Sequence, residues 1–179
     1  LITGNTGFKG SWLSAWLIKL GANIIGISKD IPTKPSIFEE LKLENQIKYY
    51  KEDVRDLEKM NNIISNEKPD FIFHLAAQPL VLRSYADPIE TISSNVMGTA
   101  NILESMKKLS NKCTAIIITS DKSYDNIEQE SGYKEDDVLG GKDIYSGSKG
   151  AAELIIKSFY HSFIKSKNNN LRIAVARAG

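Results

Sequence analysis

Tyr145 and Lys149 lie four residues apart in the run YSGSK, at the start of a stretch with helical spacing. Residues four apart share one face of a helix, so the two side chains are expected side by side. Tyrosine, with a pKa of about 10, is a poor base at neutral pH, but a nearby ammonium favours its phenolate. The pair predicts a base that takes a proton from a substrate hydroxyl. The alternative interpretation is an ordinary amphipathic helix surface, because Y-x-x-x-K often occurs by chance.

Ser120 places a hydroxyl where it can join this pair. It directly follows AIIIT at 115–119, an apolar run that predicts a strand. Ser120 would hydrogen-bond the same substrate hydroxyl as Tyr145, which brings three polar groups around one reacting carbon. The pair of Tyr145 and Lys149 also indicates a catalytic site more strongly here than it would alone, because it follows a glycine loop and several predicted strands.

The glycine loop is GNTGFKG, with Gly4, Gly7 and Gly10 between a strand tail and a predicted helix. Glycines allow a tight turn and a close approach of backbone to phosphate, and the helix N-terminus favours a pyrophosphate. The alternative is a plain tight turn. Asp30 follows the next strand about 20 residues later, where an acid binds the adenosine ribose hydroxyls of a dinucleotide. Lys29 beside it leaves the choice between NAD and NADP open.

Short apolar runs alternate with stretches of helical period, a pattern typical of βαβ units. Predicted strands cover 1–3, 23–28, 47–51, 71–75, 115–119 and 172–176, and predicted helices cover 10–20, 57–66, 88–109 and 145–165. Because these strands are apolar at consecutive residues, we expect them to be buried on both faces of a parallel sheet. We therefore predict an α/β, doubly wound, Rossmann-like domain. In the helix at 88–109, a stripe of Ile92, Val96, Leu103 and Met106 is expected to face the core.

Composition is that of an ordinary soluble globular protein, with 179 residues, 41% hydrophobic and a formal net charge of +1. The charge balance gives no indication of a nucleic-acid or membrane partner, and a cytoplasmic location is the default. Cys113, the single cysteine, excludes an intramolecular disulfide and is expected to be a small buried or edge residue. SKNNN at 166–170 is predicted as a surface loop. Both ends are expected to be cut from a longer chain, with residues 1–179 as one dinucleotide-binding domain.

The spacing G-x-x-G-x-x-G resembles the extended short-chain dehydrogenase/reductase superfamily. In that superfamily an aspartate after the third strand contacts the adenine, and Asp53 in EDVRD stands at the matching place; its alternative role is in a helix N-cap region. Ala76 and Ala77 in HLAAQ would let the backbone pass close to the cofactor. The NAD site implied by the resemblance comprises Gly4, Thr6, Gly7, Phe8, Lys9, Gly10, Asp30, Asp53, Val54, Leu75, Ala76, Ala77, Tyr145 and Lys149.

Within that superfamily, TSDKSYDN resembles the nucleotide-sugar 4,6-dehydratases. The wider dehydratase group has Thr-Asp-Glu where this chain has Ser120, Asp121 and Lys122. A lysine in place of the glutamate is what the CDP-glucose branch shows. The stretches that also look like that branch are GNTGFKGSWLSAWL, DIPTKPSIFE, HLAAQPLVLRSYADP, NVMGT and GYKEDDVLGGKDIYSGSKGAAE, so the resemblance covers essentially the whole chain.

This resemblance implies conversion of CDP-glucose to CDP-4-keto-6-deoxyglucose with tightly bound NAD and no net redox change. Tyr145, whose phenolate is favoured by the Lys149 ammonium and by the positive nicotinamide ring, would take the C4 hydroxyl proton. Asp121 would protonate the leaving C6 hydroxyl. Lys122 would be the C5 base when neutral, or would stabilise the enolate as a cation. The resemblance also implies a smaller substrate domain after residue 179, so the isolated chain is expected to turn over little substrate. A homo-oligomer is expected for the whole protein. The alternatives are another nucleotide-sugar dehydratase, a C4 epimerase or a non-catalytic NAD(P)-binding module.

Five further residues carry weaker signals. His74 and His161 are expected to be structural, because neither has a second metal ligand at a suitable spacing, and no metal site is predicted. Asn95 either stabilises the active-site backbone, as such asparagines do in the superfamily, or packs in mid-helix. Arg83 and Arg177 either meet a nucleotide phosphate or form ion pairs, with ion pairing the safer interpretation.

Overall fold

A computed structural model describes residues 1–165 and 170–179, so all but the last residue of the predicted SKNNN loop lies outside the described residues. The strands are β1 (Ile2–Thr3), β2 (Ile25–Ile27), β3 (Lys48–Tyr50), β4 (Phe71–His74), β5 (Cys113–Ser120) and β6 (Leu171–Ala178). The α-helices are α1 (Phe8–Lys19), α2 (Ile37–Glu40), α3 (Leu57–Glu67), α4 (Val81–Ala86), α5 (Pro88–Ile92), α6 (Gly98–Met106) and α7 (Ile144–Phe159). Short 3-10 turns lie at Leu43–Asn45 (η1) and Asp121–Ser123 (η3), and π-helical turns at Ser93–Met97 (η2) and Tyr160–Ile164 (η4).

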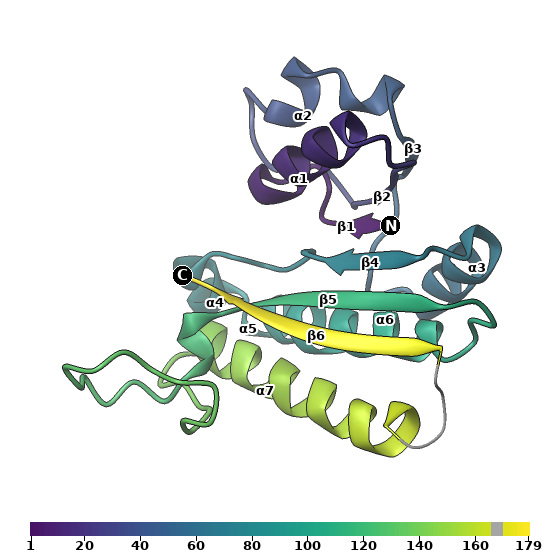
Figure 1. The fold of residues 1–179 in the computed structure, drawn as a ribbon. Helices are drawn as coiled ribbons and strands as arrows, with labels where there is room; N and C mark the ends of the chain where they lie inside the picture. Colours follow the sequence, from purple (N-terminus) through teal and green to yellow (C-terminus); the bar gives the residue numbers. More distant parts are fainter. Residues whose placement is uncertain (166–169) are drawn as a thin grey trace.

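The sheet has the order β3-β2-β1-β4-β5-β6, and every neighbouring pair is parallel. The order reverses direction between β1 and β4, and parallel sheets of this kind bind ligands beyond the carboxyl ends of their strands at that switch point. The α/β doubly wound prediction is therefore confirmed. Figure 1 shows β4, β5 and β6 as the longest part of the sheet, with the C-terminus at the same edge as the end of β4.

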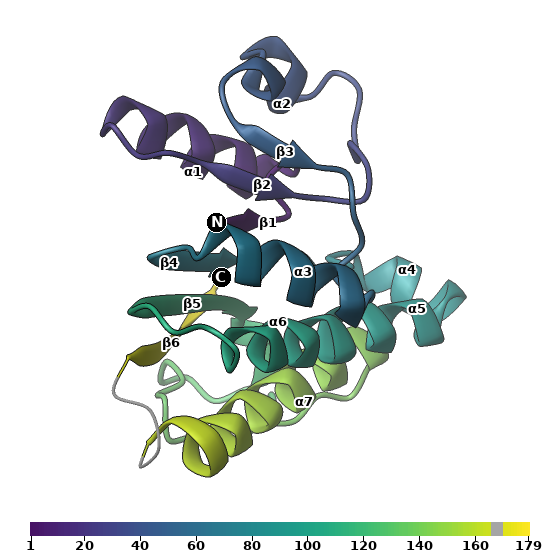
Figure 2. The same cartoon turned by 90° about the vertical axis from the view of Figure 1, so that its right-hand side faces the viewer.

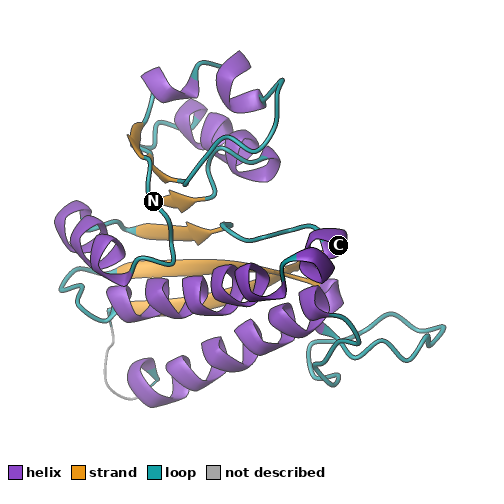
Figure 3. Cartoon of the chain, turned by 180° about the vertical axis from the view of Figure 1, so that it is seen from behind, coloured by secondary structure: helices purple, strands orange, loops and turns teal. Residues whose placement is uncertain are grey.

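Helices α3, α6 and α7 lie on one side of the sheet and α1 on the other (Figure 2). From behind, α6 and α7 stand in front of the strands (Figure 3). The core fills the space between these helices and the sheet, where aliphatic and Met side chains exclude water. Its fully buried members include Met60, Ile64, Ile72, Ile102, Leu103, Met106, Ala115 and Ile117.

The expectation that every strand is buried on both faces is wrong for β4 to β6. Burial along β5 alternates from Cys113 to Ile118, and Phe71 on β4 is 55% exposed. The reason is that α3, α6 and α7 share one face, while α1 reaches only the β1–β2 side, as the open view onto these strands in Figure 1 shows. Cys113 is buried, as predicted.

The single helix predicted at 88–109 is divided by the π-helical turn Ser93–Met97. A π turn holds an extra residue, so the helical face rotates across it. Leu103 and Met106 are buried as predicted, but Ile92, on the other side of the turn, is 40% exposed. The core-facing assignment of Ile92 is therefore wrong. The same turn points Asn95 into the interior, where it is 2% exposed.

Candidate active site

The glycine loop forms a tight connection between β1 and α1. Gly4 has a φ of +71°, a left-handed conformation that favours glycine, and its N–H donates to Ile27 O at 2.8 Å. A Cβ on Gly4 would lie 2.8 Å from Ala76 N, and one on Gly10 would lie 2.1 Å from Gly4 O. Both positions are therefore too crowded for a side chain. This packing brings the start of α1 against the end of β4.

The N-terminus of α1 suits an anion. Gly7 is its N-cap, and among the described residues no side chain caps the helix and no acidic residue lies in its first turn. The first N–H groups and the positive end of the helix dipole can therefore bind a phosphate group. Thr6 steadies the loop, because its hydroxyl donates to Asp30 O at 2.6 Å. Phe8 is the first residue of α1, and its side chain is 72% exposed. Its backbone is therefore the part of Phe8 that belongs to this end of the helix.

Lys29 is the residue that leaves the choice between NAD and NADP open in the sequence. In the structure its side chain forms an ion pair away from Asp30. Its ammonium donates to Glu90 Oε1 on α5 at 2.9 Å, and Arg83 of α4 contacts the other oxygen of the same carboxylate. The ion-pair interpretation of Arg83 is thereby confirmed. Asp30, next to Lys29, is exposed at the end of β2, where a ribose hydroxyl of a dinucleotide would lie.

Asp53 follows β3 and is held by its neighbour Arg55. The Arg55 guanidinium donates to both carboxylate oxygens, from Nε to Oδ1 at 3.1 Å and from Nη2 to Oδ2 at 2.6 Å. Partial burial raises the pKa of Asp53, but these hydrogen bonds and the Arg55 charge outweigh it, and the pKa lies below its usual value. The N-cap of α3 is Asp56, so the alternative N-cap role for Asp53 is wrong. Asn101 donates to the carbonyl of Val54 and fixes this segment.

His74 fixes the end of β4 beneath the run Leu75, Ala76 and Ala77. Its Nδ1 lies 2.7 Å from Thr3 Oγ1 and its Nε2 lies 3.1 Å from Thr99 Oγ1. Burial lowers its pKa to about 3, so the ring is neutral. The Thr99 hydroxyl donates to Asn95 O, and therefore accepts from the ring. Thr3 Oγ1 in turn accepts from Ala76 N at 3.1 Å. These contacts agree with the structural role expected for His74.

Asn95 joins the loop after β4 to α7. Its Oδ1 accepts from Gln78 N at 2.8 Å, and its Nδ2 donates to Gln78 O at 3.2 Å and Ser148 Oγ at 2.9 Å. Ser148 lies between Tyr145 and Lys149 on α7. Of the two interpretations of Asn95, these contacts support the one in which it holds the backbone of the site. The partners Gln78 and Ser148 were not among the residues predicted from the sequence.

Tyr145 and Lys149 lie on the first turns of α7, which begins at Ile144. Asp143 caps this helix by accepting from Ser146 N at 2.9 Å. Both side chains are buried, with exposed fractions of 8% for Tyr145 and 7% for Lys149. The Lys149 ammonium lies 5.9 Å from the centre of the tyrosine ring. The proximity predicted from their spacing is therefore present.

The expected phenolate is not favoured by the chain itself. Burial raises the pKa of Tyr145, and the Ser120 hydroxyl, which acts to lower it, does not compensate. Burial also lowers the pKa of Lys149 to about 8, with the charge of Lys9 adding to the effect. Desolvation is the largest cause of both pKa shifts, so burial pushes each group toward its neutral form. A lowered tyrosine pKa therefore needs further positive charge at the site.

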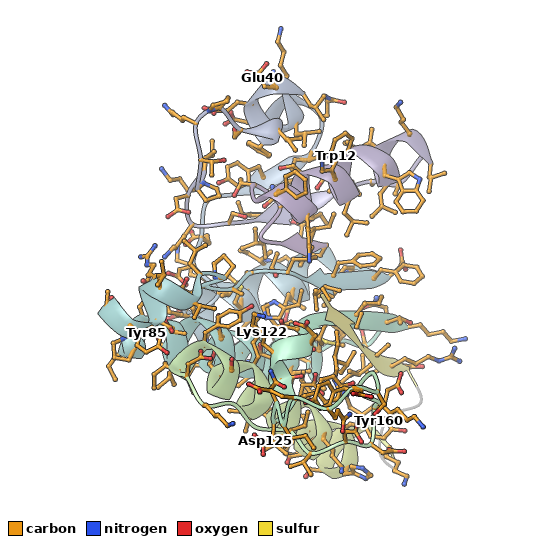
Figure 4. All side chains as sticks on the ribbon, turned by 90° about the vertical axis from the view of Figure 1, so that its left-hand side faces the viewer. Trp12, Glu40, Tyr85, Lys122, Asp125 and Tyr160 are labelled. Atoms are coloured by element: carbon orange, nitrogen blue, oxygen red, sulfur yellow. The ribbon has the colours of Figure 1, made fainter. Side chains whose placement is uncertain are left out.

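Ser120, Asp121 and Lys122 form the turn that closes β5. Ser120 is the last strand residue, and its Oγ accepts from Lys122 N at 3.3 Å and donates to Asp121 Oδ1 at 3.1 Å. Asp121 and Lys122 are both exposed. Figure 4 looks onto the edge of the sheet where the strands end, and Lys122 lies near its middle. The turn thus presents an acid, an amine and a hydroxyl at the switch-point edge.

Arg177, which is partly buried, forms an ion pair with the buried Glu153 of α7. Its Nε donates to Glu153 Oε1 at 2.7 Å, and its Nη1 donates to Tyr124 Oη at 2.6 Å. The ion-pair interpretation of Arg177 is confirmed. Glu153 itself was missed from the sequence, although its place four residues after Lys149 put it on the same helix face.

Taken together, these residues place one tyrosine, one lysine and a Ser-Asp-Lys turn beside a helix N-terminus and the glycine loop. This combination can bind a dinucleotide and move protons at a hydroxyl-bearing carbon. Within residues 1–165 and 170–179, no three or more His, Cys, Asp or Glu side chains are grouped to hold a metal ion. In the same part of the chain, no helix is long and apolar enough to cross a membrane.

A sequence model of GDP-mannose 4,6 dehydratase matches residues 1–171. The chain belongs to the GDP-mannose 4,6 dehydratase family. It is 49% identical to the CDP-glucose 4,6-dehydratase of Salmonella typhimurium over 99% of the chain and 50% of that protein. It is 32% identical to the dTDP-D-glucose 4,6-dehydratase of Dictyostelium discoideum over 96% of the chain and 43% of that protein. The chain therefore spans about half the length of these curated relatives.

Solved structures show the same fold as this dehydratase-family chain. The UDP-glucose 4-epimerase of Thermotoga maritima with UDP-glucose has a TM-score of 0.84 at 24% identity, covering 98% of this chain and 53% of that one. The Thermus thermophilus UDP-glucose 4-epimerase complex with NAD has a TM-score of 0.83 at 21% identity, with coverage of 98% and 53%. At these identities the likeness establishes the Rossmann-like fold.

Proposed function

We propose that the whole protein is a CDP-glucose 4,6-dehydratase, and that residues 1–179 form its dinucleotide-binding domain. The observation that carries the proposal is the meeting of Tyr145 and Lys149 with the Ser120–Asp121–Lys122 turn at the switch-point edge. A tyrosine and lysine suffice for oxidation at a hydroxyl, but removing water needs an additional acid and base. Identity of 49% to a CDP-glucose 4,6-dehydratase over 99% of the chain supports the same assignment.

The cofactor that fits the site is NAD. The crowded glycine turn and the uncapped N-terminus of α1 suit its pyrophosphate, and Asp30 suits a ribose hydroxyl. The pairing of Lys29 with Glu90 removes the cation that would favour a 2′-phosphate, which supports NAD over NADP. Bound NAD supplies the hydride acceptor for C4 of the sugar and the hydride donor for C6, together with positive charge near Tyr145.

Tyr145 takes the proton of the C4 hydroxyl. Its raised pKa in the chain alone means that it becomes a base only when positive charge offsets its burial. Lys149, whose pKa is about 8, is mostly protonated at neutral pH and supplies part of that charge. Ser120 faces Tyr145 and holds the same substrate hydroxyl. Oxidation at C4 makes the C5 proton acidic.

Asp121 and Lys122 then carry out the elimination across C5 and C6. Asp121 donates a proton to the leaving C6 hydroxyl, and Lys122 either removes the C5 proton or stabilises the enolate as a cation. Asp121 and Lys122 are exposed directly after β5, so a substrate that approaches from solvent can reach both side chains. An epimerase needs no such acid and amine, and a non-catalytic module needs neither these nor the Tyr–Lys pair.

The remaining proposals concern the whole protein. It acts on a small-molecule substrate in the cytoplasm without nucleic acid or membrane, and it assembles as a homo-oligomer. A second domain, which binds the nucleotide and the sugar, accounts for the half of the curated relatives that this chain does not span. On its own, the chain described here should bind NAD weakly and form little or no product.

The test is incubation of the whole protein with CDP-, UDP-, GDP- and dTDP-glucose, followed by the absorbance of the ketosugar in base. We expect product from CDP-glucose and its loss in Tyr145→Phe. Activity on dTDP-glucose but not on CDP-glucose would contradict the substrate assignment. Full activity of Tyr145→Phe would contradict the mechanism.

A further inference from the structure

We propose that Glu153 is a positioning residue that holds the Ser120–Asp121–Lys122 turn in place for the elimination step. The inference rests on the proposed dehydratase function and goes beyond it, because Glu153 contacts none of the three residues that would act on the sugar. It contacts Thr119, which directly precedes Ser120, and Ser123, which directly follows Lys122. The structure thereby assigns a role to a buried carboxylate that the proposed mechanism does not otherwise use.

One carboxylate oxygen of Glu153 binds both ends of the turn. Oε1 accepts from Thr119 Oγ1 at 2.7 Å and from Ser123 Oγ at 3.2 Å. Thr119 directly precedes Ser120, and Ser123 directly follows Lys122. The turn is therefore fastened to α7 at both of its ends, on the same helix that carries Tyr145 and Lys149.

The surroundings of Glu153 make this arrangement rigid. Its side chain is 5% exposed, and Thr119 and Ser123 are 5% and 0% exposed. Arg177 of β6 binds both carboxylate oxygens, so the negative charge is compensated. Burial raises the pKa of Glu153, but Arg177 and the two hydroxyls outweigh it and keep the group ionised at neutral pH. A buried, fully bonded carboxylate of this kind fixes the groups it binds, because moving one of them leaves a charge unsatisfied.

Tyr145 is positioned by other contacts. Asp143 caps the start of α7, and Asn95 binds Ser148 on the next turn. Loss of the Glu153 contacts should therefore displace Ser120, Asp121 and Lys122 more than Tyr145 and Lys149. Because a misplacement of 1 Å can cost about 100-fold in rate, the elimination should be slowed selectively.

Glu153→Gln tests this, since it keeps the shape but removes the charge that holds Arg177. The whole protein is assayed on CDP-glucose and on its 6-deoxy-6-fluoro analogue, both of which yield the same ketosugar. Fluoride departs as an anion and needs no proton from Asp121, while the C5 proton is still removed. We expect the rate on CDP-glucose to fall by about 10- to 100-fold and the rate on the fluoro analogue to fall less, because misplacement of Ser120 and Lys122 slows both substrates but misplacement of Asp121 slows only CDP-glucose.

Ser123→Ala is the second variant, because it removes one of the two hydroxyl contacts and leaves the Glu153–Arg177 pair intact. It should show the same selective loss, but smaller. The matched control is Glu67→Gln, which removes a carboxylate bonded to Lys48 and to Tyr50 at 2.6 Å, at the β3 edge. The control should leave the ratio of the two rates unchanged.

Equal losses on the two substrates in Glu153→Gln, or no loss on either, would overturn the inference and leave the proposed function standing. A wild-type protein that forms ketosugar from neither substrate would instead overturn the proposed function, and the inference with it. A change in the rate ratio in Glu67→Gln as large as that in Glu153→Gln would also overturn the inference, because the effect would then follow from any lost carboxylate.

Discussion

The ammonium of Lys149 lies 5.9 Å from the centre of the Tyr145 ring, and both side chains are buried. Burial raises the pKa of the phenol and lowers that of the amine, so each group is pushed toward its neutral form. Without further positive charge, Tyr145 therefore stays a neutral phenol and does not become the phenolate that acts as a base. A positive nicotinamide ring beside it would supply the charge that the chain lacks, which couples cofactor binding to the activation of the base.

This coupling predicts that NAD lowers the pKa of Tyr145. Without NAD, the Tyr145 phenol should titrate above its usual value of about 10, and with saturating NAD its titration should move down. The measurement is the ultraviolet difference titration between the wild-type chain and Tyr145→Phe, in which the other tyrosines cancel. A Tyr145 signal that titrates below pH 10 in the absence of NAD would contradict the argument.

Lys149→Met should stabilise the folded chain at pH 7. The folded state holds the Lys149 proton less tightly than the unfolded state, with a pKa of about 8 against the usual 10.5. Folding at neutral pH therefore carries a cost of about 1.4 kcal/mol per unit of pKa difference, which Met does not carry. The unfolded state binds more protons between these two pKa values, so wild-type stability should rise relative to the variant from pH 8 to 10.5. Urea unfolding across that range measures the difference, and a constant difference would refute the account.

The sheet and its order follow from features that are local in sequence. Apolar runs such as AIIIT at 115–119 and FIFHL at 71–75 locate strands, and the glycine loop locates the first turn. Two features were not predictable in this way. The π-helical turn at 93–97 depends on how Asn95 binds Gln78, a contact between segments distant in sequence. The open face of β4 to β6 depends on which side of the sheet each helix takes, which periodicity does not encode.

The residues proposed to react could be selected from the sequence because their chemistry is carried by residue type and spacing. Tyr145, Lys149 and Ser120 needed only the motif and the end of a strand. The residues that hold them were not, since Glu153 and Gln78 act through contacts that form only in the fold. The raised pKa of Tyr145 was also missed, because burial cannot be read from a four-residue spacing.

His74 should make the chain sensitive to acid. Its pKa is about 3 in the folded state against the usual 6.5, so below pH 6.5 the unfolded state binds a proton that the folded state does not. Stability should fall by about 1.4 kcal/mol for each pH unit between 6.5 and 3, in addition to the contribution of other groups. His74→Gln should be less stable at pH 7, because Thr3 and Thr99 lose the ring, but should lack this part of the slope. Urea unfolding of both proteins at several pH values gives the slopes, and parallel slopes would exclude His74 as the cause.

Gly10 and Gly147 should respond in opposite ways to alanine. Both lie in helices, where alanine is intrinsically favoured over glycine by about 1 kcal/mol. A Cβ on Gly10 would lie 2.1 Å from Gly4 O, a backbone atom that cannot move without shifting β1 or α1. On Gly147 the nearest atom would be 4.0 Å away. Gly147→Ala should therefore stabilise the chain by about 0.5 to 1 kcal/mol, whereas Gly10→Ala should destabilise it by at least about 2 kcal/mol and weaken NAD binding. Thermal unfolding and NAD titration of the two variants test this, and a Gly10→Ala chain as stable as wild type would show that the α1–β1 contact is not tight.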